Sequence, residues 1–106
     1  MWIFTSNAFL SIVVHKNDPS IRLVRGRCNG DIEAVFPDAN VFEDVAADYR
    51  YRAVIPVDDV ACVLAKHVLE MDYTNFKNSI PNEKHDYHNA CLQVWQTMHG
   101  LQASAR

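Results

Sequence analysis

The spacing of apolar residues changes once along this chain, and that change constrains the fold more than any other feature. Up to residue 57, apolar residues form short runs or alternate with polar ones, which is typical of β-strands. From Asp58 onward they recur at intervals of three and four residues, which is typical of amphipathic helices. Strands gathered early and helices gathered late predict an α+β fold, in which helices cover one face of an antiparallel sheet.

Four segments have the composition of strands, and the last of them also alternates between apolar and polar residues. They are residues 2–5, 9–15, 21–27 and 49–57. The second and third flank a polar loop, Lys16 to Ser20, and are expected to form a hairpin. Pro56, near the end of the fourth strand, predicts an edge position or a strand exit.

Capping residues place the helices. Asn29 is expected to cap a short helix, Asp58 a long one, and Asn82 the last one, which Gly100 is expected to end. A further short helical segment is expected within residues 73–80. The predicted order is βββαβααα, with a sheet of three to four strands.

Composition limits the class of protein. A chain of 106 residues, 49% of them hydrophobic, suits a single domain over residues 1–106. The net charge of −3 disfavours a general nucleic-acid binder, because phosphate contacts need Lys or Arg. Three widely spaced cysteines predict free thiols and a cytoplasmic location. The apolar run 8–14 is too short to span a bilayer, so no membrane partner is expected.

The arginines are the most distinctive polar feature, and they form the candidate ligand site. They are Arg25, Arg27, Arg50 and Arg52. If their strands pair, these guanidinium groups could converge on the uncovered sheet face and attract phosphates or carboxylates. Alternatively, they face water and pair with the acidic stretch 43–48. Strand alternation puts Tyr49 and Tyr51 on the face opposite Arg50 and Arg52, which argues against base stacking beside them.

Other reactive side chains do not complete a site. His85, His88 and Cys91 have helical spacing, but a structural zinc site needs a fourth ligand, so neither a metal nor a cofactor is expected. Cys28 precedes a predicted helix, where a thiol could be activated, but no second catalytic group is identifiable. We therefore expect no catalytic residue.

The last helix suggests an interaction surface. Both tryptophans, Trp2 and Trp95, are expected in the core, yet Leu92 and His99 flank the apolar stripe that contains Trp95. Leu92, Trp95 and His99 are therefore the candidate protein interface. The leading hypothesis is a non-enzymatic protein-binding module that contacts a partner or a second copy. By analogy alone, it could be a phage or mobile-element inhibitor or adaptor.

Two alternative functions stay open. One is a nucleic-acid or anionic-ligand binder that uses the arginines. The other is an enzyme with an unrecognised site at Cys28 or one of the histidines.

Several segments together resemble a known family. They are residues 1–5, 9–13, 24–27, 48–53, 71–77 and 94–95. With these segments the chain resembles an uncharacterised family of small bacterial proteins that begin Met-Trp-aliphatic-Phe-Thr. The resemblance implies no activity, so it assigns no functional residue. Within residues 72–77, Tyr73 and Phe76 either dock a short helix or form a recognition surface.

Overall fold

The computed structural model of the chain describes residues 1–105 and contains two compact units. The first unit is Met1–Asp72, and the second begins at Tyr73. The expected single domain over residues 1–106 stays a prediction.

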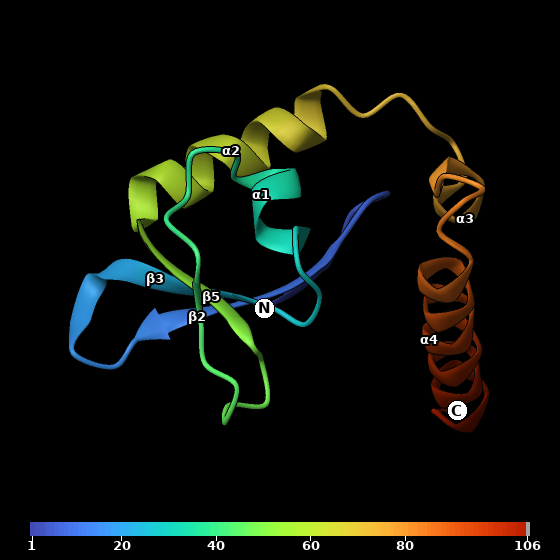
Figure 1. Cartoon of the computed structure of the whole chain (residues 1–106). Coiled ribbons are helices and arrows are strands. Elements are labelled where there is room, and N and C mark those ends of the chain that lie inside the picture. Colours follow the sequence, from blue (N-terminus) through green and yellow to red (C-terminus); the bar gives the residue numbers. More distant parts are fainter. Residues whose placement is uncertain (106) are drawn as a thin grey trace. The chain divides into compact units, whose positions relative to one another are not determined.

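The first unit is built on one antiparallel sheet of five strands (Figure 1). They are β1 (Trp2–Phe4), β2 (Phe9–His15), β3 (Asp18–Gly26), β4 (Phe42–Glu43) and β5 (Tyr51–Pro56). Their order across the sheet is β1-β2-β3-β5-β4, and every neighbouring pair is antiparallel.

The α+β class and the antiparallel sheet are thereby confirmed, but the strand count and element order were wrong. The observed order is βββαββααα, because β4 adds a strand where none was predicted. β4 has only two residues, too few to show alternation, and it forms by pairing with Tyr51 and Arg52 of β5.

The β2–β3 hairpin is tighter than predicted. β3 begins at Asp18, so only Lys16 and Asn17 lie between the strands. A register shift after Val14 pairs His15 with Asp18. The turn-forming residues thus enter the strand, where Asp18 Oδ1 accepts hydrogen bonds from the backbone N–H and the hydroxyl of Ser20 at 2.9 and 2.6 Å.

Two helices of the first unit, α1 (Asp31–Val35) and α2 (Val57–Leu69), lie on the same face of the sheet (Figure 1). The core lies between them and the sheet, and it consists of Ala8, Leu10, Ile12, Val24, Ile32, Val35, Phe36, Ala53, Ile55 and Val60. Gly26 allows α1 to approach closely, because a Cβ atom there would lie 3.3 Å from Asp31 Cβ and 3.4 Å from Ile32 Cγ1.

Two predicted caps in this unit were wrong. α2 begins at Val57, directly after Pro56, so Asp58 lies in the first turn, where its charge favours the helix dipole. Gly30, whose φ of 91° suits glycine, precedes α1 in place of Asn29. Pro56 is the last residue of β5, so the predicted strand exit is confirmed. β4 pairs only with Tyr51 and Arg52, so β4 does not reach Pro56, and the predicted edge position is not contradicted.

The second unit contains α3 (Phe76–Ser79) and α4 (His85–Ser104). Asn75 caps α3, because its Oδ1 accepts a 3.1 Å hydrogen bond from the backbone N–H of Asn78. The expected boundaries of the last helix were wrong. Lys84 precedes α4 in place of Asn82, and the helix continues through Gly100, where an interior glycine costs about 1 kcal/mol. None of the helices within residues 1–105 combines the length and apolarity needed to cross a membrane.

Candidate anion-binding face of the sheet

The face of the sheet opposite α1 and α2 carries a row of directly paired residues. Ser11 pairs with Trp2 on one side and with Arg25 on the other, and Arg52 pairs with both Arg25 and Phe42. Side chains of directly opposed residues lie on the same face. We call this set, Trp2–Ser11–Arg25–Arg52–Phe42, the arginine row.

Three guanidinium groups surround Tyr49, and two of them belong to residues of the row. Arg25 Nη2 donates a 2.7 Å hydrogen bond to Ser11 Oγ. Arg27 Nη1 donates to the backbone carbonyl of Asp48 at 3.0 Å, and Arg52 Nε donates to that of Tyr49 at 3.1 Å. We call Arg25, Arg27 and Arg52 the arginine cluster.

Tyr49 is the platform on which the cluster rests. The Cζ atoms of Arg25 and Arg27 lie 4.5 and 4.1 Å from the centroid of its ring, which is within cation–π range. The Phe9 ring centroid lies 6.5 Å away, and Tyr49 is only 4% exposed. The prediction that Tyr49 shares a face with Tyr51 was wrong, because β5 begins at Tyr51 and residues 47–49 are bends.

Arg50 does not join the cluster. Its Nε lies 3.1 Å from Glu43 Oε2, and both side chains are about half exposed. Its Cζ lies 5.8 Å from the ring of Tyr51. Arg50 therefore pairs with the acidic stretch 43–48, as the second of the two interpretations of the arginines predicted. Exposed pairs of this kind contribute roughly 0–1 kcal/mol.

The cluster carries more positive charge than its neighbours neutralise. Within residues 1–105, Arg52 is the only one of the three with a carboxylate in range, at 3.8 Å from Asp48 Oδ1. That carboxylate is 72% exposed. The Cζ atoms of Arg25 and Arg27 meet one ring, so they lie less than about 9 Å apart, near the Debye length at physiological salt, and salt screens their repulsion only in part. A bound anion would relieve that repulsion.

Burial adds a further cost at Arg25. Its Nε is buried and has no hydrogen-bond partner in the described part of the chain. An unsatisfied buried donor costs about 1–3 kcal/mol. The stack on Tyr49 and the bond to Ser11 hold this guanidinium in place in spite of that cost.

Sequence reasoning missed the aromatic ends of the row. Trp2 was expected in the core, but it is 67% exposed, and Phe42 is 50% exposed. The Trp2 indole contacts Phe9 edge-on, at a centroid distance of 5.7 Å. Only the strand register reveals that these rings flank the arginines.

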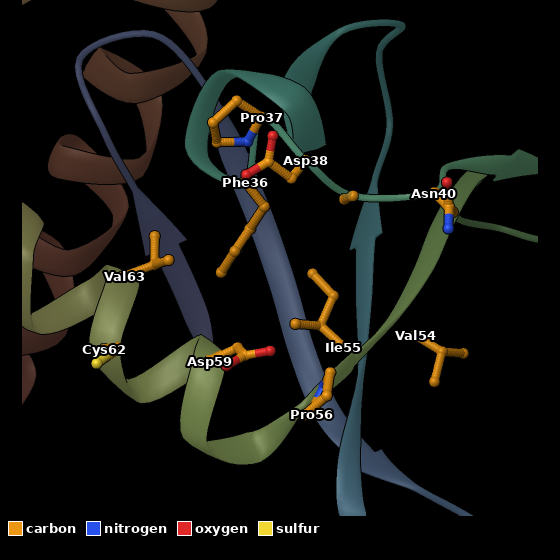
Figure 2. A pocket seen from close by; sticks show the side chains of 11 residues that line it. Phe36, Pro37, Asp38, Asn40, Val54, Ile55, Pro56, Asp59, Cys62 and Val63 are labelled. Carbon is orange, nitrogen blue, oxygen red and sulfur yellow. The ribbon is translucent and has the colours of Figure 1, made fainter.

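A groove on the helical side of the first unit is a weaker candidate (Figure 2). It has a volume of about 360 Å³ and lies between residues 36–40, β5 and α2. Asp38 and Asp59 reach it from opposite walls (Figure 2). Its charged groups are acidic, so it does not complement the anions that the arginine cluster attracts.

His85, His88 and Cys91, which have the helical spacing of metal ligands, do not form a metal site in the structure. His85 and His88 line a small pocket of about 240 Å³, whereas Cys91 is buried. Burial raises the pKa of the Cys91 thiol, and a hydrogen bond from Tyr87 opposes the shift. Across residues 1–105, no three His, Cys, Asp or Glu side chains are grouped as metal ligands.

Cys28 is exposed, and its backbone N–H donates a 3.4 Å hydrogen bond to the Asp31 carboxylate. The loop thus places an anion where thiolate chemistry favours a cation or a base.

The predicted protein interface lies on α4. Leu92 is half-buried, while Trp95 is 52% exposed, so the expectation of a core position for Trp95 was wrong. The Trp95 and His99 rings stack with a centroid distance of 5.2 Å and an interplanar angle of 3°. Lys77 Nζ lies 4.7 Å from the centroid of Trp95. The indole is thus flanked by polar groups.

Comparison with protein-family models, with curated proteins and with solved structures yields no match for this chain. The resemblance to an uncharacterised bacterial family stays a prediction.

Proposed function

We propose that this protein is a non-catalytic binder of anionic ligands, and that the arginine cluster is its binding site. The observation that carries the proposal is the convergence of Arg25, Arg27 and Arg52 around Tyr49, where Asp48 is the one carboxylate within ion-pair distance among residues 1–105. Guanidinium groups offer planar, paired donors that match phosphate and carboxylate oxygens.

A binding role also fits the neutral groups of the cluster. Ser11 is 1% exposed, and its hydroxyl accepts a hydrogen bond from Arg25. It therefore positions the guanidinium rather than serving as a nucleophile. Tyr49 is buried beneath two cations and supports them from below.

Binding of inorganic tripolyphosphate and of citrate, measured by isothermal titration calorimetry at low and high salt, tests the proposal. We expect binding that weakens as salt rises, and a loss of about 10-fold for Arg25→Gln or Arg27→Gln, because each removes a charged hydrogen-bond donor. Comparing the two probes distinguishes a phosphate site from a carboxylate site.

Arg50→Gln is the matched control, because it removes the same charge from a residue that pairs with Glu43 outside the cluster. We expect its effect to stay within about 2-fold. The proposal fails if neither anion binds at low salt, or if Arg50→Gln weakens binding as much as Arg25→Gln does.

A second candidate function, self-association, is favoured by α4. Trp95, Met98 and Leu101 lie along one side of this helix and are 52%, 55% and 56% exposed. The helix has 20 residues, and Asp86 is its only charged residue among Asp, Glu, Lys and Arg, so two copies could pack without like-charge repulsion. The proposed partner is therefore a second copy of the chain.

Light scattering after size-exclusion chromatography tests this second proposal. A dimer that Met98→Asp converts to a monomer is the expected result, since the change would bury a charge in an apolar contact. A monomer at all concentrations would remove it.

A further inference from the structure

We infer that the anionic ligand is a short single-stranded nucleic acid that crosses the strands along the arginine row. This inference rests on the proposed function, and it adds the two exposed aromatic residues, which a small anion does not need. Proteins that hold single strands without sequence preference combine cations along the backbone with aromatic rings on which bases stack. The arginine row contains both elements in one line across the sheet.

The register sets the order of groups in that line. Trp2 and Phe42 occupy its ends, on β1 and β4, and Arg25 and Arg52 occupy its middle. The Arg52 side chain is 19% exposed and Arg25 is half-buried, so phosphates would contact the outer edges of these guanidinium groups and the exposed Arg27 beside them. A base could then reach an aromatic ring on either side.

The length of the row fits a few nucleotides. Neighbouring strands lie about 4.8 Å apart, so the four intervals from β1 to β4 span about 19 Å. That span suits a site of about four nucleotides, the lower end of the range for small sheet domains that bind single strands.

The rings at both ends are available for stacking. Trp2 is 67% exposed and is held by its edge-on contact with Phe9, so the indole is oriented before a base arrives. Phe42 is 50% exposed. Tyr49 is 4% exposed, so it supports the cations and is not a stacking platform.

The charge pattern favours single strands over duplexes. The chain carries a net charge of −3, so a long polyanion that covers more of the surface would meet acidic side chains. A short strand confined to the row meets the arginine cluster, and the adjacent Glu43 is already paired with Arg50.

The test uses fluorescence anisotropy with fluorescein-labelled eight-nucleotide oligothymidylate and oligouridylate. A DNA duplex of the same length is a third ligand, and inorganic tripolyphosphate is titrated in parallel. We expect both single strands to bind more tightly than the duplex, and the comparison of the two strands shows whether DNA or RNA is preferred. Trp2→Ala and Phe42→Ala should each weaken oligonucleotide binding about 10-fold and leave tripolyphosphate binding within about 2-fold.

Leu69→Ala is the control, since it removes an 84% exposed apolar side chain from α2, on the other face of the sheet, and it should change neither affinity. Circular dichroism confirms that each variant is folded. Two results would overturn the inference and leave the proposed function standing. In the first, tripolyphosphate binds and the oligonucleotides bind no more tightly than it does. In the second, Trp2→Ala and Phe42→Ala do not change the affinity for the oligonucleotides. If no anion binds, both fail.

Discussion

Replacement of Tyr49 by leucine tests whether this ring supports the arginine cluster. The substitution keeps an apolar side chain at a position that is 4% exposed, but it removes two cation–π contacts and a ring contact with Phe9. A cation–π contact contributes about 0.5–1 kcal/mol when exposed and about 2 kcal/mol when desolvated. The ring pair adds about 0.5–1.5 kcal/mol. We expect Tyr49→Leu to lower the free energy of unfolding by about 2–3 kcal/mol, and Tyr49→Phe, which keeps the ring, by less than about 0.5 kcal/mol.

Urea unfolding provides the measurement. The experiment uses a Trp95→Phe background, so that the fluorescence of Trp2 reports on the first unit alone. A double-mutant cycle with Arg27→Gln isolates one of the cation contacts, and we expect a coupling energy of about 0.5–1 kcal/mol. A loss of less than about 0.5 kcal/mol for Tyr49→Leu would show that the ring does not support the guanidinium groups.

Three further predictions follow from local features. Hydrogen bonds from the hydroxyl and the backbone N–H of Ser20 lower the pKa of Asp18. These bonds therefore stabilise the hairpin at neutral pH, and the stabilisation should disappear as the pH falls through the lowered pKa. The NMR chemical shift of the Ser20 amide would report this loss, and a shift that does not change with pH would contradict the prediction. Burial raises the pKa of Cys91, so iodoacetamide should modify the exposed Cys28 and Cys62 first and reach Cys91 only at higher pH. Mass spectrometry can show the order, and equal rates at Cys91 and the exposed thiols would oppose this prediction. Asn75→Ala should destabilise α3 by about 1 kcal/mol, seen as faster hydrogen exchange at residues 76–79, and unchanged exchange would refute the cap.

The parts of the fold that follow from local periodicity could be predicted. The run of aromatic and β-branched residues within 9–15 correctly located β2. Alternation within 49–57 correctly located β5, because a half-buried strand needs apolar residues at every second position. The helical stripe after Asp58 correctly indicated α2, whose Val60 is buried in the core. These features depend on neighbours within a few residues along the chain.

The features that define the candidate site depend on distant pairing and could not be predicted. Phe42 lies in a two-residue strand that exists because β5 is beside it, and Trp2 reaches the row only through the register of β1 on β2. Tyr49 reverses its predicted face because the strand starts two residues later than the alternation indicated. Composition identified the arginines as a group. However, Arg27 and Arg52 bind the backbone carbonyls of Asp48 and Tyr49, whereas Arg50 does not, and the bend at residues 47–49 places these carbonyls.

The lengths of the outermost strands restrict how another molecule can recognise this sheet. β1 has three residues and β4 has two, so these two outermost strands each offer only a few unpaired peptide groups. A peptide that tried to extend the sheet would gain little main-chain bonding, and accidental joining of sheets into aggregates is discouraged for the same reason. Selective contact with the first unit must therefore be made through side chains on its broad surfaces.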